Sequence, residues 1–398
     1  MEKKINLFFS EKISLLILIL ISLIVIISSN LIYVYEEELS LMDASGYILL
    51  AKDPTQYLYV QHQDALRILP SILVFLLKHT GLSIENCFKY LTYFFFAYLH
   101  IKTFYLVKSY KIENYLALSF IAILFYSNHA VIYIVFNYYQ LVDLLTYILI
   151  LYFIQLHQNF NLKKLFFLSL LAIFTKEYLL ILVFGVHIKY FLQYKKNNII
   201  KSLIIILLIF LFHYKFASYH NVNVQTKESL VYLIGNYIKD YPLYFKSIID
   251  CLFLEKNIFL LMPFSLLFFF SKFIKFLFEY WSIVLFAAVP IFFTIFMFHL
   301  VGTNFFRIFY QGYFIIIILG LLFIFQNNRL STNTKLLIFI SPGFFVIDFI
   351  YIYLNIYQDG FIRFFQYARY ENISGYYLFN MTIILLILFN IKNFLVKK

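Results

Sequence analysis

Acidic side chains in an otherwise apolar chain are the first candidates for chemistry. Asp43 follows the first long apolar segment, and Tyr47 comes one helical turn later. A carboxylate needs water or a polar partner, so this stretch must lie at an aqueous boundary. There Asp43 could act as a general base toward a hydroxyl group or hold a divalent cation such as Mg²⁺ or Mn²⁺. The simpler interpretation is a solvated loop acid, and position alone favours it.

A second group of ionisable residues stands at the ends of later apolar segments. Asp143 begins such a segment, where it is either a site acid facing a polar cavity or a cap at a helix N-terminus. Lys176 and Glu177 separate two short apolar segments, and as neighbours they point in different directions. Lys176 is either a phosphate-binding cation or a lysine that extends to the membrane interface.

Two arginines complete the set of candidates. Arg67 precedes a short apolar segment that contains Pro70, and Arg307 begins a long one. Arginine makes bidentate contacts with phosphate, but a single arginine at the end of a membrane span is also an ordinary anchor. Each candidate by itself is as compatible with a structural role as with a functional one. Their placement on one side of a membrane would favour a common site.

Several other kinds of site are not indicated. The histidines lack the HExxH spacing of a zinc protease, and Cys87 and Cys251 have no metal-ligand spacing. A glycine-rich phosphate loop is also missing from the sequence, which argues against transport driven by ATP within this chain.

Composition predicts the fold class. Of 398 residues, 63% are hydrophobic and 13% charged, and the mean hydropathy is +0.84. Repeated apolar runs separated by short polar intervals predict an all-α polytopic membrane protein. The net charge of +12 comes from lysines placed singly or in pairs between these runs. That pattern is typical of cytoplasmic loops and not of a nucleic-acid-binding surface.

The distribution of lysines also predicts the topology. We expect about twelve transmembrane helices, with both termini in the cytoplasm. Residues 35–86 form a long first outer loop, in which 40–52 and 69–79 are too short to cross and should be helices on the membrane surface. If 69–79 crossed instead, the lysine pairs further on would move outside. A second outer loop is expected over 218–255. The pairs that this topology places inside are Lys108 and Lys111, Lys163 and Lys164, and Lys195 and Lys196.

The order of these features resembles that of the bacterial GT-C superfamily of integral membrane glycosyltransferases. The likeness covers residues 1–218 well and 219–398 loosely, within one integral membrane domain spanning 1–398. It rests on Asp43 and Tyr47 in the first outer loop, Arg67 and Pro70 before a surface helix that Gly81 closes, Asp143, and the pair Thr175 and Lys176. Many relatives have a paired acid or a double proline in the first loop. Here Met42 precedes Asp43 and Pro70 stands alone, so the use of a metal stays open.

The resemblance implies a transferase of the bacterial inner membrane. Such an enzyme moves a sugar from a polyprenyl-phosphate-linked donor to a glycan, lipid or protein acceptor at the periplasmic face. The resemblance makes Asp43 the catalytic base or metal-facing acid and Asp143 the second acid. Lys176 and Arg307 become contacts for the lipid phosphate. We place Tyr47, Arg67 and Glu177 in the same substrate-binding site.

Two other functions remain open from the sequence. A lipid-linked oligosaccharide flippase would carry charges along a central path through its spans, whereas Asp143, Lys176 and Arg307 stand at the outer ends. A polysaccharide polymerase usually has its main outer loop late in the chain, and here the long loop follows the first span. Both observations favour the transferase.

Overall fold

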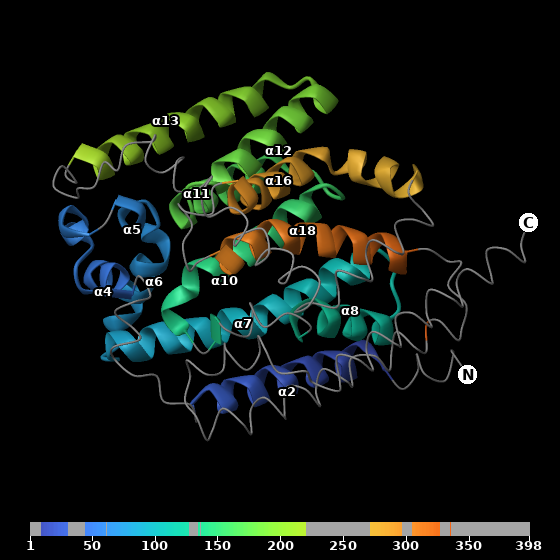
Figure 1. The fold of residues 1–398 in the computed structure, drawn as a ribbon, viewed down its shortest axis with the longest axis horizontal. Helices are drawn as coiled ribbons and strands as arrows, with labels where there is room; N and C mark the ends of the chain where they lie inside the picture. The colour runs from blue at the N-terminus through green and yellow to red at the C-terminus, as the bar shows by residue number, and fades with distance from the viewer. Residues whose placement is uncertain are drawn as a thin grey trace, which may run out of the picture.

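The all-α prediction is confirmed for the part of the chain that the structure describes. This structure is a computed structural model, and it describes residues 9–30, 44–60, 62–126, 134–135, 137–219, 271–296, 305–326 and 335. Within these ranges every regular element is a helix (Figure 1). Asp43 lies outside them. Arg307 lies in a described helix, but its side chain is not described.

The helices follow the apolar segments of the sequence closely. The first part of the chain forms α2 (Glu11–Asn30), α4 (Ala44–Lys52), the 3-10 helix η1 (Pro54–Tyr59), α5 (His62–Leu66), α6 (Ile68–Lys78), α7 (Ile84–Ser109) and α8 (Asn114–Tyr126). The later part forms the 3-10 helix η2 (Tyr138–Gln140), α10 (Leu141–Leu156), α11 (Leu162–Thr175), α12 (Leu179–Tyr194), α13 (Asn197–Tyr219), α16 (Trp281–Phe296) and α18 (Phe305–Phe325).

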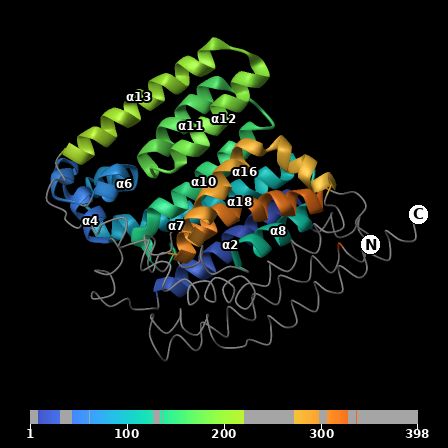
Figure 2. The same ribbon diagram turned by 45° about the horizontal axis from the view of Figure 1, so that its top comes forward.

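Helix α10 is the centre of the described bundle. All of its residues except Tyr152 and Gln155 are buried. It packs against α7, α11, α6 and α18, while α2 lies across α7 and α8 and α13 lies beside α11 and α12 (Figure 2). A helix that is apolar on every side has to be surrounded by other elements. The sequence of α10 therefore accounts for its central place.

Several helices are suited to cross a membrane. Among the described residues, three segments are long and apolar enough, namely Glu11–Ser29, Tyr138–Leu156 and Asn197–Ala217. A fourth is possible if the bent pair Ser271–Glu279 and Trp281–Ile291 is one span. The outer helix α13 keeps large apolar side chains exposed, with Leu208 at 61% and Phe212 at 75%. Such a surface is suited to lipid. The count of about twelve spans stays a prediction, and the expected spans at 258–270, 336–353 and 376–389 lie outside the described residues.

The hairpin of α11 and α12 is short for a pair of spans. Its helices have 14 and 16 residues, which at about 1.5 Å per residue gives about 21 to 24 Å, less than the roughly 30 Å of a hydrocarbon core. A hairpin of this length that starts at one membrane surface does not bring its tip, Lys176 and Glu177, to the other. If the hairpin starts at a membrane surface, as the lysine pattern predicts, its tip needs partners within the protein.

The first loop contains helices close to the predicted positions. We expected short helices over 40–52 and 69–79, and the structure has α4 and α6 there. They pack on each other, and the Ser71 hydroxyl donates to the Tyr47 carbonyl at 3.2 Å. Asp53 caps η1 by accepting from the Thr55 backbone N–H at 2.9 Å. Whether these helices lie on a membrane surface stays a prediction.

One acid of this loop differs from the expectation. Asp64 lies in the predicted first outer loop, where an acid is expected to be solvated, but it is only 2% exposed. Its carboxylate fills the space above Gly46, where an added Cβ would lie 2.1 Å from the Asp64 Oδ2 atom. The expectation was wrong because α4 and α5 pack against each other and cover this side chain.

The first prediction concerns topology and uses fusions of a compartment reporter to the full chain. A fusion after Gly81 should report the periplasm, and fusions after Lys111 and after Lys196 should report the cytoplasm, because lysine-rich loops stay inside. The measurement is reporter activity normalised to the amount of fusion protein. A cytoplasmic signal after Gly81 would show that α6 crosses, and would place the first loop on both sides of the membrane.

Candidate functional site

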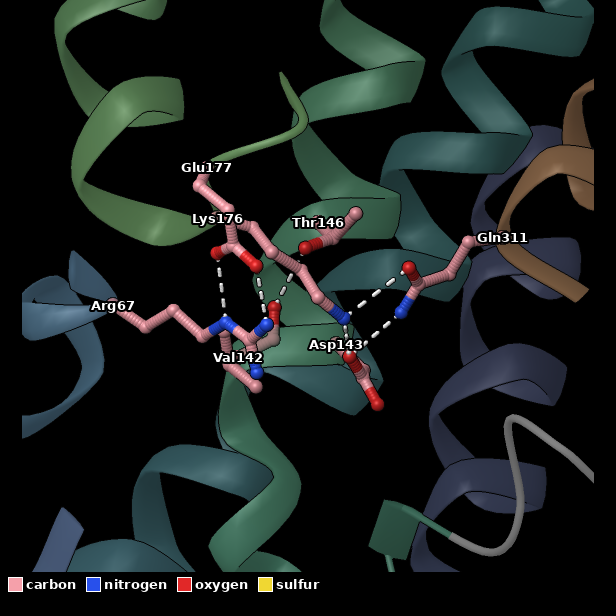
Figure 3. A network of polar contacts seen from close by, with 7 residues as sticks. All are labelled: Arg67, Val142, Asp143, Thr146, Lys176, Glu177 and Gln311. Atoms are coloured by element: carbon pink, nitrogen blue, oxygen red, sulfur yellow. Dashed lines mark hydrogen bonds and ion pairs between the residues drawn. The ribbon is translucent and has the colours of Figure 1, made fainter. Parts of the chain in front are cut away.

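Two ion pairs meet where the first loop, the start of α10 and the tip of the α11–α12 hairpin come together (Figure 3). The inner pair joins the Lys176 Nζ atom to the Asp143 Oδ1 atom at 2.5 Å. The outer pair joins Arg67 to Glu177. These four residues were all candidates from the sequence, and the structure brings them together.

The local structure places Lys176 and Glu177 at a sharp change of direction. Helix α11 ends at Thr175, and Lys176 has an extended backbone with φ of −160°. The two neighbouring side chains then point apart, as expected for adjacent residues. Lys176 points toward α10 and α18, and Glu177 points toward Arg67 of the first loop (Figure 3).

The inner pair is completed by an amide from α18. The Gln311 Nε2 atom donates to the Asp143 Oδ1 atom at 2.6 Å, and the Gln311 Oε1 atom accepts from the Lys176 Nζ atom at 3.2 Å. Gln311 and Asp143 are 0% exposed and Lys176 is 1% exposed. Lys176 therefore does not extend to solvent as an interfacial anchor would. Removing either charged partner would leave a buried charge uncompensated.

Sequence reasoning missed Gln311, although the sequence carries a signal for it. Gln311 is an amide within the otherwise apolar run of α18, and polar side chains in such runs usually have specific partners. The next residue, Gly312, lets α18 approach α16, because an added Cβ would lie 2.4 Å from the Ala287 carbonyl oxygen. The amide thus joins α18 to α10, and the glycine lets α18 pack closely on α16.

The outer pair has the two-pronged geometry of an arginine and a carboxylate. The Arg67 Nε atom donates to the Glu177 Oε2 atom at 2.9 Å, and the Arg67 Nη2 atom donates to the Oε1 atom. The side chains are 10% and 30% exposed, so this pair lies nearer the surface than the inner pair.

Both partners of the outer pair are held in their charged forms. Burial by itself would raise the pKa of Glu177, but the hydrogen bonds and the charge of Arg67 outweigh it and keep that pKa below its usual value. Burial would lower the pKa of Arg67, and Glu177 together with Tyr47 raises it well above its usual value. Tyr47, also a candidate from the sequence, is 1% exposed and acts directly on Arg67.

The structure describes the last two candidates, Arg307 and Asp43, only in part or not at all. Arg307 is on α18, four residues before Gln311, so the two residues share a face of that helix. Asp43 lies outside the described residues. It directly precedes α4 in the sequence, and Tyr47 of that helix interacts with Arg67.

A divalent cation has little support from the described residues. Among them there is no group of three or more His, Cys, Asp or Glu side chains that could hold a metal ion. The Oδ1 atom of Asp143 accepts hydrogen bonds from Lys176 and Gln311. These contacts are those of a carboxylate in an ion pair. Asp43, the residue that the sequence suggested as a metal ligand, lies outside the described residues.

The second prediction tests whether Asp143 and Lys176 form a structural unit. Asp143→Asn and Lys176→Met should each lower the free energy of unfolding by about 3 to 5 kcal/mol, because each leaves a buried charge without its partner. The double variant should lose less than the sum of the two single losses. The measurement is unfolding of the purified full chain in detergent.

A matched control comes from an exposed pair. Lys89→Gln removes an i, i+4 pair with Glu85 and should cost less than about 1 kcal/mol. Additive losses for Asp143→Asn and Lys176→Met, or losses no larger than that of the control, would contradict the structural role.

The comparisons with known proteins leave the geometry as the basis for assigning a function. No protein-family model matches this chain, and neither a curated protein nor a solved structure matches it. The function is therefore argued from the ion pairs and from the residues that surround them.

Proposed function

We propose that this chain is a membrane glycosyltransferase of the GT-C type. It moves a sugar from a polyprenyl-phosphate-linked donor to a glycan, lipid or protein acceptor at the periplasmic face of the bacterial inner membrane. The observation that carries the proposal is the convergence of Arg67, Asp143, Lys176 and Glu177 from three separate parts of the chain. Charged groups within a largely apolar protein are costly and are usually functional when they cluster.

The two ion pairs suit different roles in such a reaction. Arg67 presents a planar fork, and in the proposal the donor phosphate replaces Glu177 on this fork. The partial exposure of Glu177 supports this exchange, because the carboxylate can move out to water. Lys176 was first assigned to the phosphate, but its burial against Asp143 favours a positioning role for both residues. They hold the hairpin tip that carries Glu177.

The other residues complete the proposed site. Asp43 is the general base that accepts a proton from the acceptor hydroxyl group while that hydroxyl attacks the sugar carbon, and the lipid phosphate leaves. The step inverts the configuration at that carbon. Arg307 is a second cation for the phosphate, and its shared helix face with Gln311 supports this role.

A flippase for lipid-linked oligosaccharides is the second candidate. The observation that favours it is the full burial of Asp143, Lys176 and Gln311 among helices, since a transport path requires charges inside the bundle. Reconstituted protein distinguishes the functions. A transferase forms a new glycosidic bond from a radiolabelled polyprenyl-phosphate sugar, whereas a flippase moves the donor across the bilayer without a new bond.

The third prediction is that Asp43→Asn lowers the rate of sugar transfer by about 10² to 10⁴-fold, because the amide cannot accept a proton. The assay is transfer of radiolabelled sugar by the purified full chain in lipid. Asp53→Asn is the matched control, since asparagine also caps a helix and the loop keeps its structure. Asp64→Asn is not a suitable control, because Asp64 is buried against Gly46. Turnover of the Asp43 variant near that of the wild type would remove Asp43 from the mechanism.

The fourth prediction concerns the donor phosphate. Arg307→Ala should raise the KM for the donor and leave the KM for the acceptor and kcat nearly unchanged, because a phosphate contact acts equally in the ground state and the transition state. Lys164→Ala, which removes a charge from the other end of α11, is the control and should change neither constant. Equal effects on the two substrates would argue against a phosphate contact at Arg307.

A further inference from the structure

A groove lies at the end of α11 that is remote from the candidate site. It has a volume of about 350 Å³ and lies between the start of α11 and the start of α13. The side chains of Leu162, Phe166 and Ile205 form its apolar wall. The candidate site begins where α11 ends, so the length of that helix, about 21 Å, separates the two.

Two lysines are among the residues that line the groove. Lys163 comes from α11, and Lys201 and Asn198 come from the first turns of α13. Neither lysine forms an ion pair with an acid of the described chain. The sequence explains why: residues 144–176 and 178–227 contain no Asp or Glu, so neither α11 nor α13 carries an acid. Two lysines without a local acid attract an anion.

A buried hydroxyl group also lines the groove. Ser202 lines the groove and is 7% exposed, and its Oγ atom lies 3.2 Å from the Nε2 atom of the buried His187. The other ring nitrogen of His187, Nδ1, lies 2.8 Å from the Val183 carbonyl oxygen. Since a carbonyl only accepts, Nδ1 carries a proton, and in the neutral ring Nε2 then accepts from the Ser202 hydroxyl. This contact holds α13 against α12 and fixes the position of Ser202 in the groove.

The groove opens onto a surface suited to lipid. Beyond Ile205, α13 continues with exposed apolar side chains, including Leu208, Leu211 and Phe212. A fully water-soluble anion would gain no binding free energy from contact with these apolar side chains. An amphiphile with a negative head and an apolar tail fits both parts of the groove. Lysines between membrane helices on the cytoplasmic side are the kind of site that takes anionic head groups.

We infer that this groove binds an anionic phospholipid of the cytoplasmic leaflet. The lipid phosphate lies between Lys163 and Lys201, and one acyl chain runs along Phe166 and Ile205 onto the exposed face of α13. The volume is at the lower end of the range for ligand pockets, so the groove holds the head group and the first part of a chain. This site is separate from the one proposed for the polyprenyl-phosphate donor and does not depend on that proposal.

The test measures lipid binding to the purified full chain in detergent by native mass spectrometry, with phosphatidylglycerol and phosphatidylcholine as probes. The wild type should retain phosphatidylglycerol in preference to phosphatidylcholine. Lys163→Gln/Lys201→Gln should weaken phosphatidylglycerol binding at least about tenfold, because two lysine contacts to an anionic head group are lost. Lys164→Gln/Lys196→Gln removes the same charge at the same end without touching the groove and should keep the preference.

A second variant tests the apolar wall. Ile205→Trp fills the groove and leaves both lysines in place, so it should weaken phosphatidylglycerol binding as well. All variants concern exposed side chains, and their folding is checked by elution profile and melting temperature in zwitterionic detergent. An equal loss of phosphatidylglycerol binding in Lys164→Gln/Lys196→Gln would show a general attraction of the lipid to this lysine-rich end, and would overturn the site. Unchanged binding in either groove variant, or competition by glycerol phosphate as strong as that by a short-chain phosphatidylglycerol, would overturn it too.

Discussion

The described bundle depends on the pairing of Asp143 with Lys176. Both side chains are shielded from water, and an isolated charge in such a place costs several kcal/mol. The pair is tolerable because the two charges are in contact and because Gln311 bonds to both of them. Three helices, α10, α11 and α18, must therefore come together in one register. The apolar surfaces drive the packing, and the polar contacts are made only in this register of the three helices.

This network lies inside the protein at the tip of a short hairpin. Helices α11 and α12 are too short to bring their connecting residues through a full hydrocarbon layer. The tip must find partners on neighbouring elements, and it finds α10 and α18 on one side and the first loop on the other. The inner pair anchors the tip, and the outer pair of Arg67 and Glu177 joins it to the loop that carries Tyr47. The network therefore combines a fully buried inner pair with a more accessible outer pair.

The two ends of α11 differ in how their charged side chains are paired. At one end every described cation of the network has a carboxylate partner, and the charges balance. At the other end, Lys163 and Lys201 stand beside an apolar groove on helices that carry no acid. Helix α13 lies along α11 and extends to the first loop, where the His213 Nε2 atom is 3.2 Å from the Leu66 carbonyl oxygen. One helix thus contacts both the groove and the loop of the candidate site.

By itself the sequence determined the helical class, the approximate ends of most helices and the two short helices of the first loop. Those features depend on the length and spacing of apolar runs, which are local properties. It also singled out Arg67, Asp143, Lys176 and Glu177, because charges are conspicuous in apolar surroundings. The sequence left open which charge pairs with which, that Gln311 joins them, and that Asp64 is buried. These depend on contacts between residues far apart in the chain, and only the tertiary structure decided them. Hydrophobicity specifies that a helix is buried, but it does not specify the neighbour against which its one polar side chain will lie.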